Sequence, residues 1–160
     1  MIDVPPTPAL FSGFAPAQHV HPDDMPWIPS GTPGKSSKPL CFMSGNRGFV
    51  ELLRMEPGVV MPLHRHTGEI HAWNLAGYRR LCTGELVGPG DYVYEPSNNT
   101  DWWKIEADET MVALVVVIGE VEFLHGDGRV RSVVTAADQF REYSDYCRAN
   151  GLPIALGPPT

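Results

Sequence analysis

From residue 41 onward the chain is built of short apolar segments separated by Gly, Pro and Asn. Strand-like segments fall at residues 49–55, 59–66, 69–75, 78–82, 91–95, 102–106, 111–118, 119–125 and 129–134. Strands this short, at this spacing and without helices between them, are typical of antiparallel sandwiches and barrels. The predicted fold class is therefore an all-β single domain.

Both ends of the chain differ from this central region. Residues 1–40 are rich in Pro, which removes backbone donors and restricts φ, so we interpret them as an arm and not as a central strand or a regular helix. Residues 135–160 contain one predicted helix, capped by Thr135 with Asp138 three residues later. The predicted organisation is an arm at 1–40, a β-barrel at 41–134, and a helix and tail at 135–160 that cover one side of the barrel.

Charge and composition exclude several functions. The formal net charge is −7 and the sequence contains no basic cluster, which argues against nucleic acid or an anionic membrane surface as the main partner. The longest apolar run, 111–118, is far shorter than the roughly 20 residues of a membrane span. The three cysteines are far apart and form no Cys-x-x-Cys pair, so a disulfide framework is not indicated. A cytoplasmic location is the default expectation.

The segment most informative about chemistry contains His64 and His66. In a strand, residues two apart share a face, so these imidazoles are expected to point together as two ligands of one metal ion. The chain holds a second pair of the same spacing, His19 and His21. That pair lies in the Pro-rich arm without a strand around it, and we interpret it as solvated or structural.

Two motifs containing these residues resemble those of the cupin superfamily. In the first motif Gly58, His64, His66 and Gly77 fit the register, and in the second Gly90 and Pro96 fit, with Asp101 where the superfamily has a third His. The resemblance narrows to the group of 2,4'-dihydroxyacetophenone dioxygenases and acetylacetone-cleaving cupins. It covers about residues 27–152 and includes the segments Trp27-Ile-Pro, His64-Arg-His-Thr-Gly, Gly90-Asp-Tyr-Val-Tyr-Glu-Pro96 and Tyr146-Cys-Arg148.

The resemblance implies an RmlC-like jelly-roll barrel whose metal ligands are His64, His66 and Asp101. Two His and one carboxylate form the facial triad of many Fe(II) oxygenases, which makes the Asp chemically reasonable. In the alternative interpretation Asp101 only caps the turn at residues 98–100.

Further site residues are predicted around these ligands. His71 stands where many cupins have an acidic ligand, and a bulge at residues 67–68 would turn it inward as a catalytic pocket residue or fourth ligand. Members of the group have a glutamate near the metal, and this sequence has Cys82 at the corresponding position. Glu85 is close enough in the sequence to take the place of that glutamate. The predicted substrate pocket contains Cys82, Tyr94 and Trp103.

The resemblance implies a metal-dependent dioxygenase that cleaves a C–C bond next to a carbonyl in a small diketone or hydroxyketone, such as a dihydroxyacetophenone. Its expected cofactor is Fe(II), with Zn(II) or Ni(II) as alternatives, and its expected partners are the carbonyl substrate and O2. Alternative functions are a non-oxidative, zinc-binding cupin that senses a ligand, similar to the cupin-like domains of anti-sigma factors, or a metal-dependent isomerase. By analogy with other cupins, we expect a homodimer.

Overall fold

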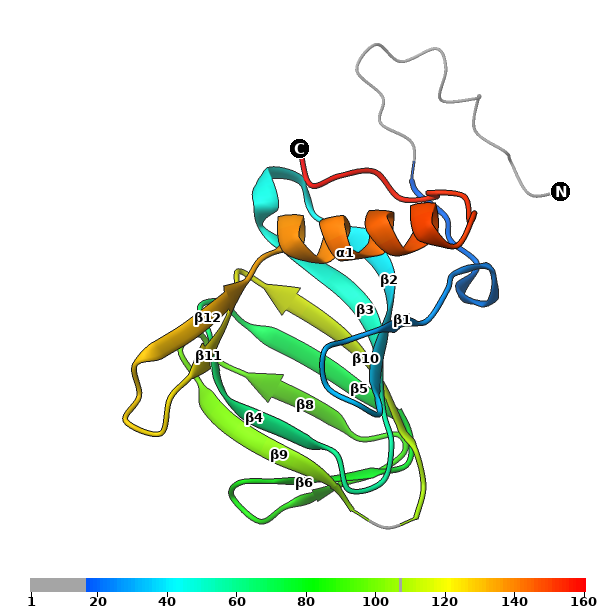
Figure 1. Ribbon diagram of the computed structural model, residues 1–160. Coiled ribbons are helices and arrows are strands. Elements are labelled where there is room, and N and C mark those ends of the chain that lie inside the picture. The colour runs from blue at the N-terminus through cyan, green and yellow to red at the C-terminus, as the bar shows by residue number, and fades with distance from the viewer. Residues whose placement is uncertain (1–16, 107) are drawn as a thin grey trace, which may run out of the picture.

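The computed structural model describes residues 17–106 and 108–160, and two antiparallel sheets face each other in it (Figure 1). The first sheet contains, in order, β1 (Ile28–Pro29), β2 (Lys35–Phe42), β3 (Gly48–Met55), β10 (Met111–Ile118), β5 (Ile70–Ala76) and β8 (Tyr92–Glu95). The second contains β12 (Val130–Val134), β11 (Val121–Leu124), β4 (Val60–His66), β9 (Thr100–Glu106), β6 (Tyr78–Leu81) and β7 (Leu86–Val87). This arrangement confirms the predicted all-β jelly roll.

Strand β10 shows how the sequence pattern builds the core. It lies between β3 and β5, and alternate residues beginning with Met111 are buried on the inner face. Met111 and Ala113 are fully buried there. β-branched residues fill most of β10, and such side chains pack well on a pleated surface. The alternation places the opposite row of side chains on the outer face, so the inner faces of the two sheets form the core.

Strand structure begins earlier than the sequence predicted. Strand β2 pairs along its length with β3 although it contains Pro39, and the register shifts between Pro39 and Cys41. An irregularity of this kind lets a Pro without a backbone donor lie in a sheet. The prediction that residues up to 40 contain no central strand is therefore wrong for 35–40, because β2 lies between β1 and β3. On the outer face the Trp27 ring packs against Lys38 and Arg54. Residues 1–16 of the predicted arm lie outside the described residues.

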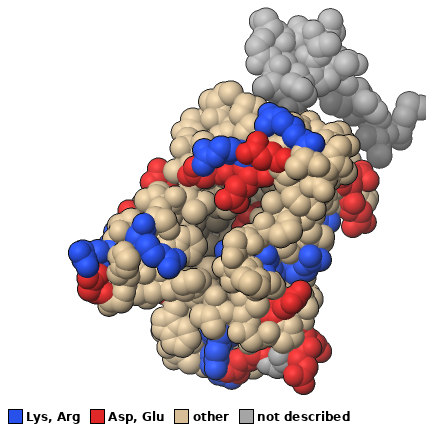
Figure 2. Space-filling model, viewed as in Figure 1, with Lys and Arg blue, Asp and Glu red and all other residues tan. Residues whose placement is uncertain are grey.

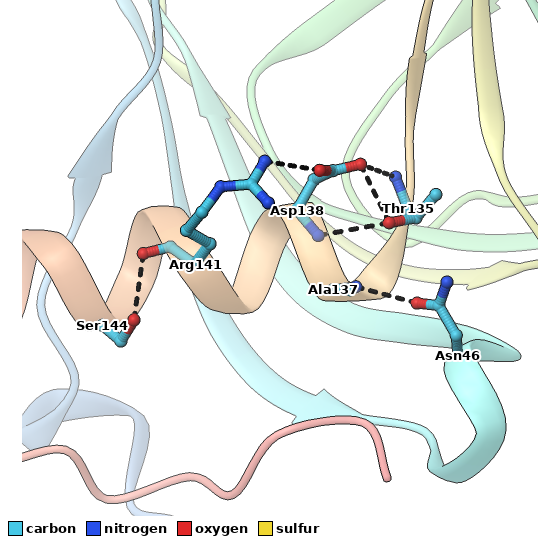
Figure 3. Close-up of polar contacts among 6 residues, drawn as sticks. All are labelled: Asn46, Thr135, Ala137, Asp138, Arg141 and Ser144. Carbon is cyan, nitrogen blue, oxygen red and sulfur yellow. Dashed lines mark hydrogen bonds and ion pairs between the residues drawn. The ribbon is translucent and has the colours of Figure 1, made fainter.

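Helix α1 (Ala136–Ala149) has the predicted N-terminus. Thr135 Oγ1 accepts a hydrogen bond from Asp138 N (3.2 Å), and Asp138 Oδ2 accepts one from Thr135 N (3.0 Å), which completes the capping box (Figure 3). Asn46, in the short 3-10 helix Ser44–Asn46, accepts a further bond from Ala137 N. A second 3-10 helix spans Pro22–Asp24. In the described part of the chain, no helix is long and apolar enough to cross a membrane.

The helix covers one end of the first sheet. Figure 1 shows α1 lying above β2 and β3, and it contacts β1 and β2. Phe140 of the helix packs edge to face against Phe42 of β2, with ring centroids 5.4 Å apart. Tyr143 of the helix is buried, and its hydroxyl accepts a hydrogen bond from Ala155 N in the C-terminal tail. The helix thereby forms one wall above the space between the sheets.

Candidate metal centre

A cavity of about 310 Å³ lies between the two sheets. The exposed residues of its lining mark its mouth: Gly31, Arg131 and Ser132 of β12, and Glu142 of α1. Figure 2 shows the surface hollowed beneath α1, with acidic side chains at the upper rim. Most of the wall is apolar, but a set of ionisable side chains also lines it: Lys35, Glu51, His64, His66, Arg79 and Glu95.

His64 and His66 lie side by side on the inner face of β4. Their side chains are only 3% and 7% exposed, and both line the cavity. The ring centroids are 4.8 Å apart and the rings are nearly perpendicular, while Arg65 between them pairs with Glu122 instead. The alternation of a strand therefore puts the two imidazoles together, as the His-x-His spacing suggested.

Burial favours the neutral form of both imidazoles. Burial lowers the pKa of His64, and burial together with the neighbouring His64 lowers the pKa of His66 to about 3. The Nδ1 atom of His64 lies 2.7 Å from the carbonyl oxygen of Pro62 and donates to it, so the lone pair is left on Nε2. Neutral imidazole is the form that binds a metal ion, and a hydrogen bond from the other ring nitrogen fixes the tautomer.

Glu95 is the residue near this pair that the sequence interpretation missed. Its Oε2 atom lies 3.5 Å from His66 Nε2, and both side chains are buried. Burial raises the pKa of Glu95, while a hydrogen bond from Asn99 opposes that effect. The alternation of β8 could have identified it. Tyr92 and Tyr94 face outward, so Val93 and Glu95, which alternate with them, face inward.

Arg79 is a second missed residue. It is 2% exposed, and its Nε and Nη2 atoms have no hydrogen-bond partner among the described residues. The guanidinium stacks over the Trp103 ring, 4.8 Å from its centroid. Burial lowers the pKa of Arg79, while Glu95 and Asp101 oppose the shift. A buried cation with unsatisfied donors in a cavity is suited to binding an anionic oxygen of a ligand.

Asp101 lies next to the His pair but also faces a second pocket. It is the direct cross-strand partner of His64 on β9, and its Oδ1 atom is buried without a hydrogen-bond partner in the described residues. A smaller pocket of about 180 Å³ contains Asp101, Cys82 and Glu95. A hydrogen bond to Asp101 raises the pKa of the Cys82 thiol. The Asp101 carboxylate thus lies between His64 and Cys82.

The prediction that His71 faces the pocket is wrong. A turn at residues 67–69 separates β4 from β5, and β5 then presents Ile70 and Ala72 to the cavity. His71 is left on the outer face, where its Nδ1 atom lies 2.6 Å from the Tyr92 hydroxyl. The register shift between β5 and β10 lies between Asn74 and Ala76, after His71, so it does not change the face on which His71 lies.

The remaining predicted site residues are divided between three places. Glu85 is exposed between β6 and β7, where it accepts a hydrogen bond from Thr83, and it lines neither pocket. The structure therefore does not bring Glu85 to the His pair; the carboxylate beside His66 is that of Glu95. Cys82 and Tyr94 line the smaller pocket, and Trp103 lines the main cavity.

The donor chemistry at this end of the cavity fits a divalent metal ion. Two neutral imidazoles and buried carboxylates are the ligands preferred by Fe(II) and Zn(II), and two of the buried atoms, His66 Nδ1 and Asp101 Oδ1, have no other partner among the described residues. In residues 17–106 and 108–160, no three His, Cys, Asp or Glu side chains are already grouped closely enough to surround an ion.

Two facing antiparallel sheets around a cavity, with paired histidines on β4, define the protein as a cupin. A family model described as the ChrR Cupin-like domain matches residues 16–122, and the chain belongs to this family. No curated protein matches the chain.

Solved structures with similar folds include cupins of different kinds. An RmlC-like cupin from Ralstonia eutropha JMP134 has a TM-score of 0.82 and 21% identity, and the match covers 89% of this chain and 95% of that one. An acetylacetone dioxygenase from Acinetobacter johnsonii has a TM-score of 0.71 and 12% identity, with 90% and 99% covered. The anti-sigma factor ChrR of Rhodobacter sphaeroides, in complex with SigE, has a TM-score of 0.50 and 23% identity, with 59% and 50% covered. These matches confirm the cupin fold, which the chain shares with an acetylacetone dioxygenase.

Proposed function

We propose that the protein is a metal-dependent cupin dioxygenase that cleaves the C–C bond next to a carbonyl in a small diketone or hydroxyketone. The observation that carries the proposal is the pair of buried, neutral imidazoles of His64 and His66, with the Glu95 carboxylate 3.5 Å from His66, at one end of an apolar cavity. The similarity to an acetylacetone dioxygenase supports the same reaction class.

His64, His66 and Asp101 are the proposed ligands. A bound divalent ion supplies Lewis acidity toward the carbonyl oxygens of the substrate, and Fe(II) also supplies electrons for the reaction with O2. We propose Fe(II) as the native ion, with Zn(II) and Ni(II) as alternatives. Asp101 completes the set because it is opposite His64 in the ladder and one of its oxygens is buried without a partner in the described part of the chain.

Glu95 is the proposed proton acceptor. A diketone reacts through its enolate, so a proton must leave the carbon between the two carbonyls. The buried carboxylate beside His66 has a raised pKa, which makes it a stronger base than an exposed Glu. That proton moves to Glu95 Oε2, and the negative charge develops on the substrate oxygens.

Arg79 is the proposed partner of that charge. Two of its nitrogen atoms, Nε and Nη2, have no hydrogen-bond partner among the described residues. Arg79 lines the same cavity, and the Trp103 ring stacks on one face of its guanidinium. Burial among apolar side chains strengthens such an ionic hydrogen bond. The completed reaction uses one O2 per diketone, and each product of the C–C cleavage carries one of its oxygen atoms.

A second candidate function is supported by the family match. Membership of the ChrR Cupin-like domain family, together with Asp101 in place of a third His, favours a non-oxidative cupin that binds Zn(II) and a ligand. The same geometry would then serve binding, and Glu95 and Arg79 would position the ligand without turnover. A metal-dependent isomerase would use the same proton acceptor but would not consume O2.

Oxygen uptake separates these functions. The protein is prepared free of metal, reconstituted with Fe(II) or Zn(II), and mixed with heptane-2,4-dione in an oxygen-electrode cell. If the protein is a dioxygenase, we expect it to consume O2 when it is loaded with Fe(II) but not with Zn(II). We expect the His64→Ala variant to lose this activity. His19→Ala is the matched control, because His19 has the same His-x-His spacing but lies outside the sheets and is exposed. If Fe(II) supports no uptake with a panel of diketones and hydroxyketones, the dioxygenase proposal is wrong.

A further inference from the structure

A second group of ionisable residues faces the cavity, on other elements than the His pair. Lys35 at the start of β2, Glu51 on β3 and Glu142 on α1 all line the same space. The His pair belongs to β4 in the opposite sheet. The cavity therefore has polar groups on two walls. The proposed oxidation uses only the wall that carries the His pair.

Glu51 is placed inside the barrel by strand parity. It lies between the inward residues Phe49 and Leu53, is only 9% exposed, and has Val115 of β10 as its cross-strand partner. Burial raises its pKa to about 7, although Lys35 and a hydrogen bond from Ser37 act in the opposite direction. A carboxyl group in this position is protonated in a large fraction of molecules at neutral pH and can then donate a hydrogen bond.

Lys35 faces the same space without a strong partner. Its Nζ atom is 4.0 Å from Met61 Sδ and 5.8 Å from the centroid of the Phe123 ring. Among residues 17–106 and 108–160, no carboxylate lies within 4.0 Å of this ammonium group. Burial lowers its pKa, while Glu51 and Glu142 oppose the shift. A half-buried ammonium group with so little compensation favours an anionic ligand.

Phe123 connects the two polar walls. Its ring centroid is 6.1 Å from that of His64, and the same ring lies beneath the Lys35 ammonium group. Met61, which contacts Lys35, is on the same strand as His64. A single small molecule in this cavity can therefore reach both Lys35 and the His pair while its chain packs on Phe123.

We propose that Lys35 and Glu51 bind the carboxylate of a small oxo acid whose carbonyl groups reach His64 and His66. The ammonium group supplies the positive charge, and the carboxyl O–H supplies a second donor, so the two oxygens of a carboxylate are both satisfied. The carbonyl end of this assignment rests on the proposed function, whereas the carboxylate end rests on Lys35 and Glu51 alone.

The assignment carries a pH dependence with a defined sign. Protonated Glu51 donates to the bound carboxylate, and ionised Glu51 repels it, so affinity rises as pH falls through about 7. The charged groups that face Glu51 are Lys35 from β2 and Glu142 from α1, while β10 presents the apolar Val115. Glu142 adds negative charge at the mouth of the cavity, which raises the pKa of Glu51 further and favours its protonated form.

Isothermal titration calorimetry with three matched ligands tests the proposal. The ligands are 4,6-dioxoheptanoate, heptane-2,4-dione, which replaces its carboxylate by methyl, and heptanoate, which lacks the carbonyls. We expect the dioxo acid to bind about tenfold more tightly than the dione at pH 6, and less so at pH 8. Lys35→Met is expected to remove this preference, and Glu51→Gln to remove most of its pH dependence. Lys104→Met, an exposed lysine outside the cavity, is the control and should change neither.

Each contrary outcome has a separate meaning. Equal affinity for the dioxo acid and the dione, or a preference that survives Lys35→Met, would overturn the proposal and leave the proposed function intact. Lys35-dependent binding of heptanoate without any binding of the dione would support the carboxylate site and contradict the proposed function. If inorganic phosphate binds through Lys35 more tightly than 4,6-dioxoheptanoate and heptanoate do, the site is one for phosphate and not for a carboxylate. That result would overturn the assignment.

Discussion

His64 and Asp101 lie directly opposite each other across the β4–β9 ladder, and both side chains are buried on the inner face of the sheet. In antiparallel strands such partners point to the same side, so the backbone register itself brings the carboxylate next to the imidazole. The second contact of Asp101, to Cys82, holds the carboxylate toward the smaller pocket. Metal binding and the Cys82 contact are therefore expected to compete for Asp101.

Asp101→Asn is predicted to weaken Fe(II) or Zn(II) binding by about 10- to 100-fold, because the amide keeps the shape of the side chain but loses the negative charge. Titration with a competing chelator measures the change. Cys82→Ala is the matched control: it frees Asp101 from its thiol contact and should leave metal affinity unchanged or slightly increased. Unaltered affinity in Asp101→Asn would remove Asp101 from the ligand set.

Glu95→Gln is predicted to lower kcat for diketone oxidation by about 100-fold while the metal content stays the same, because the amide cannot accept the substrate proton. Oxygen uptake and metal analysis are measured on the same preparation. Loss of the metal in this variant would show that Glu95 is a ligand and not the proton acceptor. Wild-type turnover would show that it is neither.

Glu51→Gln is predicted to stabilise the protein at high pH. Burial raises the pKa of Glu51 from its ordinary value of 4.5 to about 7, so the folded state holds a proton that the unfolded state has lost. The resulting stability is present below pH 4.5 and is lost as pH rises through 7, a cost of about 3 kcal/mol at pH 8. Urea unfolding at pH 5 and pH 8 should show a much smaller pH difference for the variant than for the wild type. Equal pH differences in the two proteins would contradict the buried position of this carboxyl group.

Thr135→Ala is predicted to lower the free energy of unfolding by about 1 kcal/mol, because it removes the side chain that accepts from Asp138 N at the helix N-terminus (Figure 3). Thermal unfolding followed by circular dichroism measures the loss. Thr135→Ser retains the hydroxyl and should lose little, so equal losses in the two variants would argue against the cap as the cause.

Strand positions and the helix cap could be predicted from the sequence because their signals are local. Short apolar segments bounded by Gly, Pro and Asn indicate the strands from β3 to β12 with the exception of β7, and the Thr135 cap follows from a four-residue pattern. The His64–His66 pair is local in the same sense, since one strand carries both residues. The rule that excludes Pro from strands failed at β2, because Pro39 lies at a shift in register that only the pairing with β3 reveals.

The rest of the site depends on which residues of each strand face the interior. The sequence of one segment does not define this. His71 was assigned to the wrong face because the turn at 67–69 sets the parity of β5 independently of β4. Glu51, Arg79 and Glu95 were missed because a charged residue in a strand is normally interpreted as solvent-facing. Their inward position becomes evident only when the neighbouring apolar residues of the same strand, such as Phe49 and Leu53 beside Glu51, are known to line the interior.

Metal content tests most directly whether His64 and His66 form a metal site. The protein is purified from cells grown with added iron and zinc, and its metals are measured by mass spectrometry next to His66→Ala and the His21→Ala control from the second His-x-His pair. We predict about one divalent ion per chain in the wild type and the control, and none in His66→Ala. A wild-type protein without metal, or a His66→Ala variant that keeps it, would contradict the site.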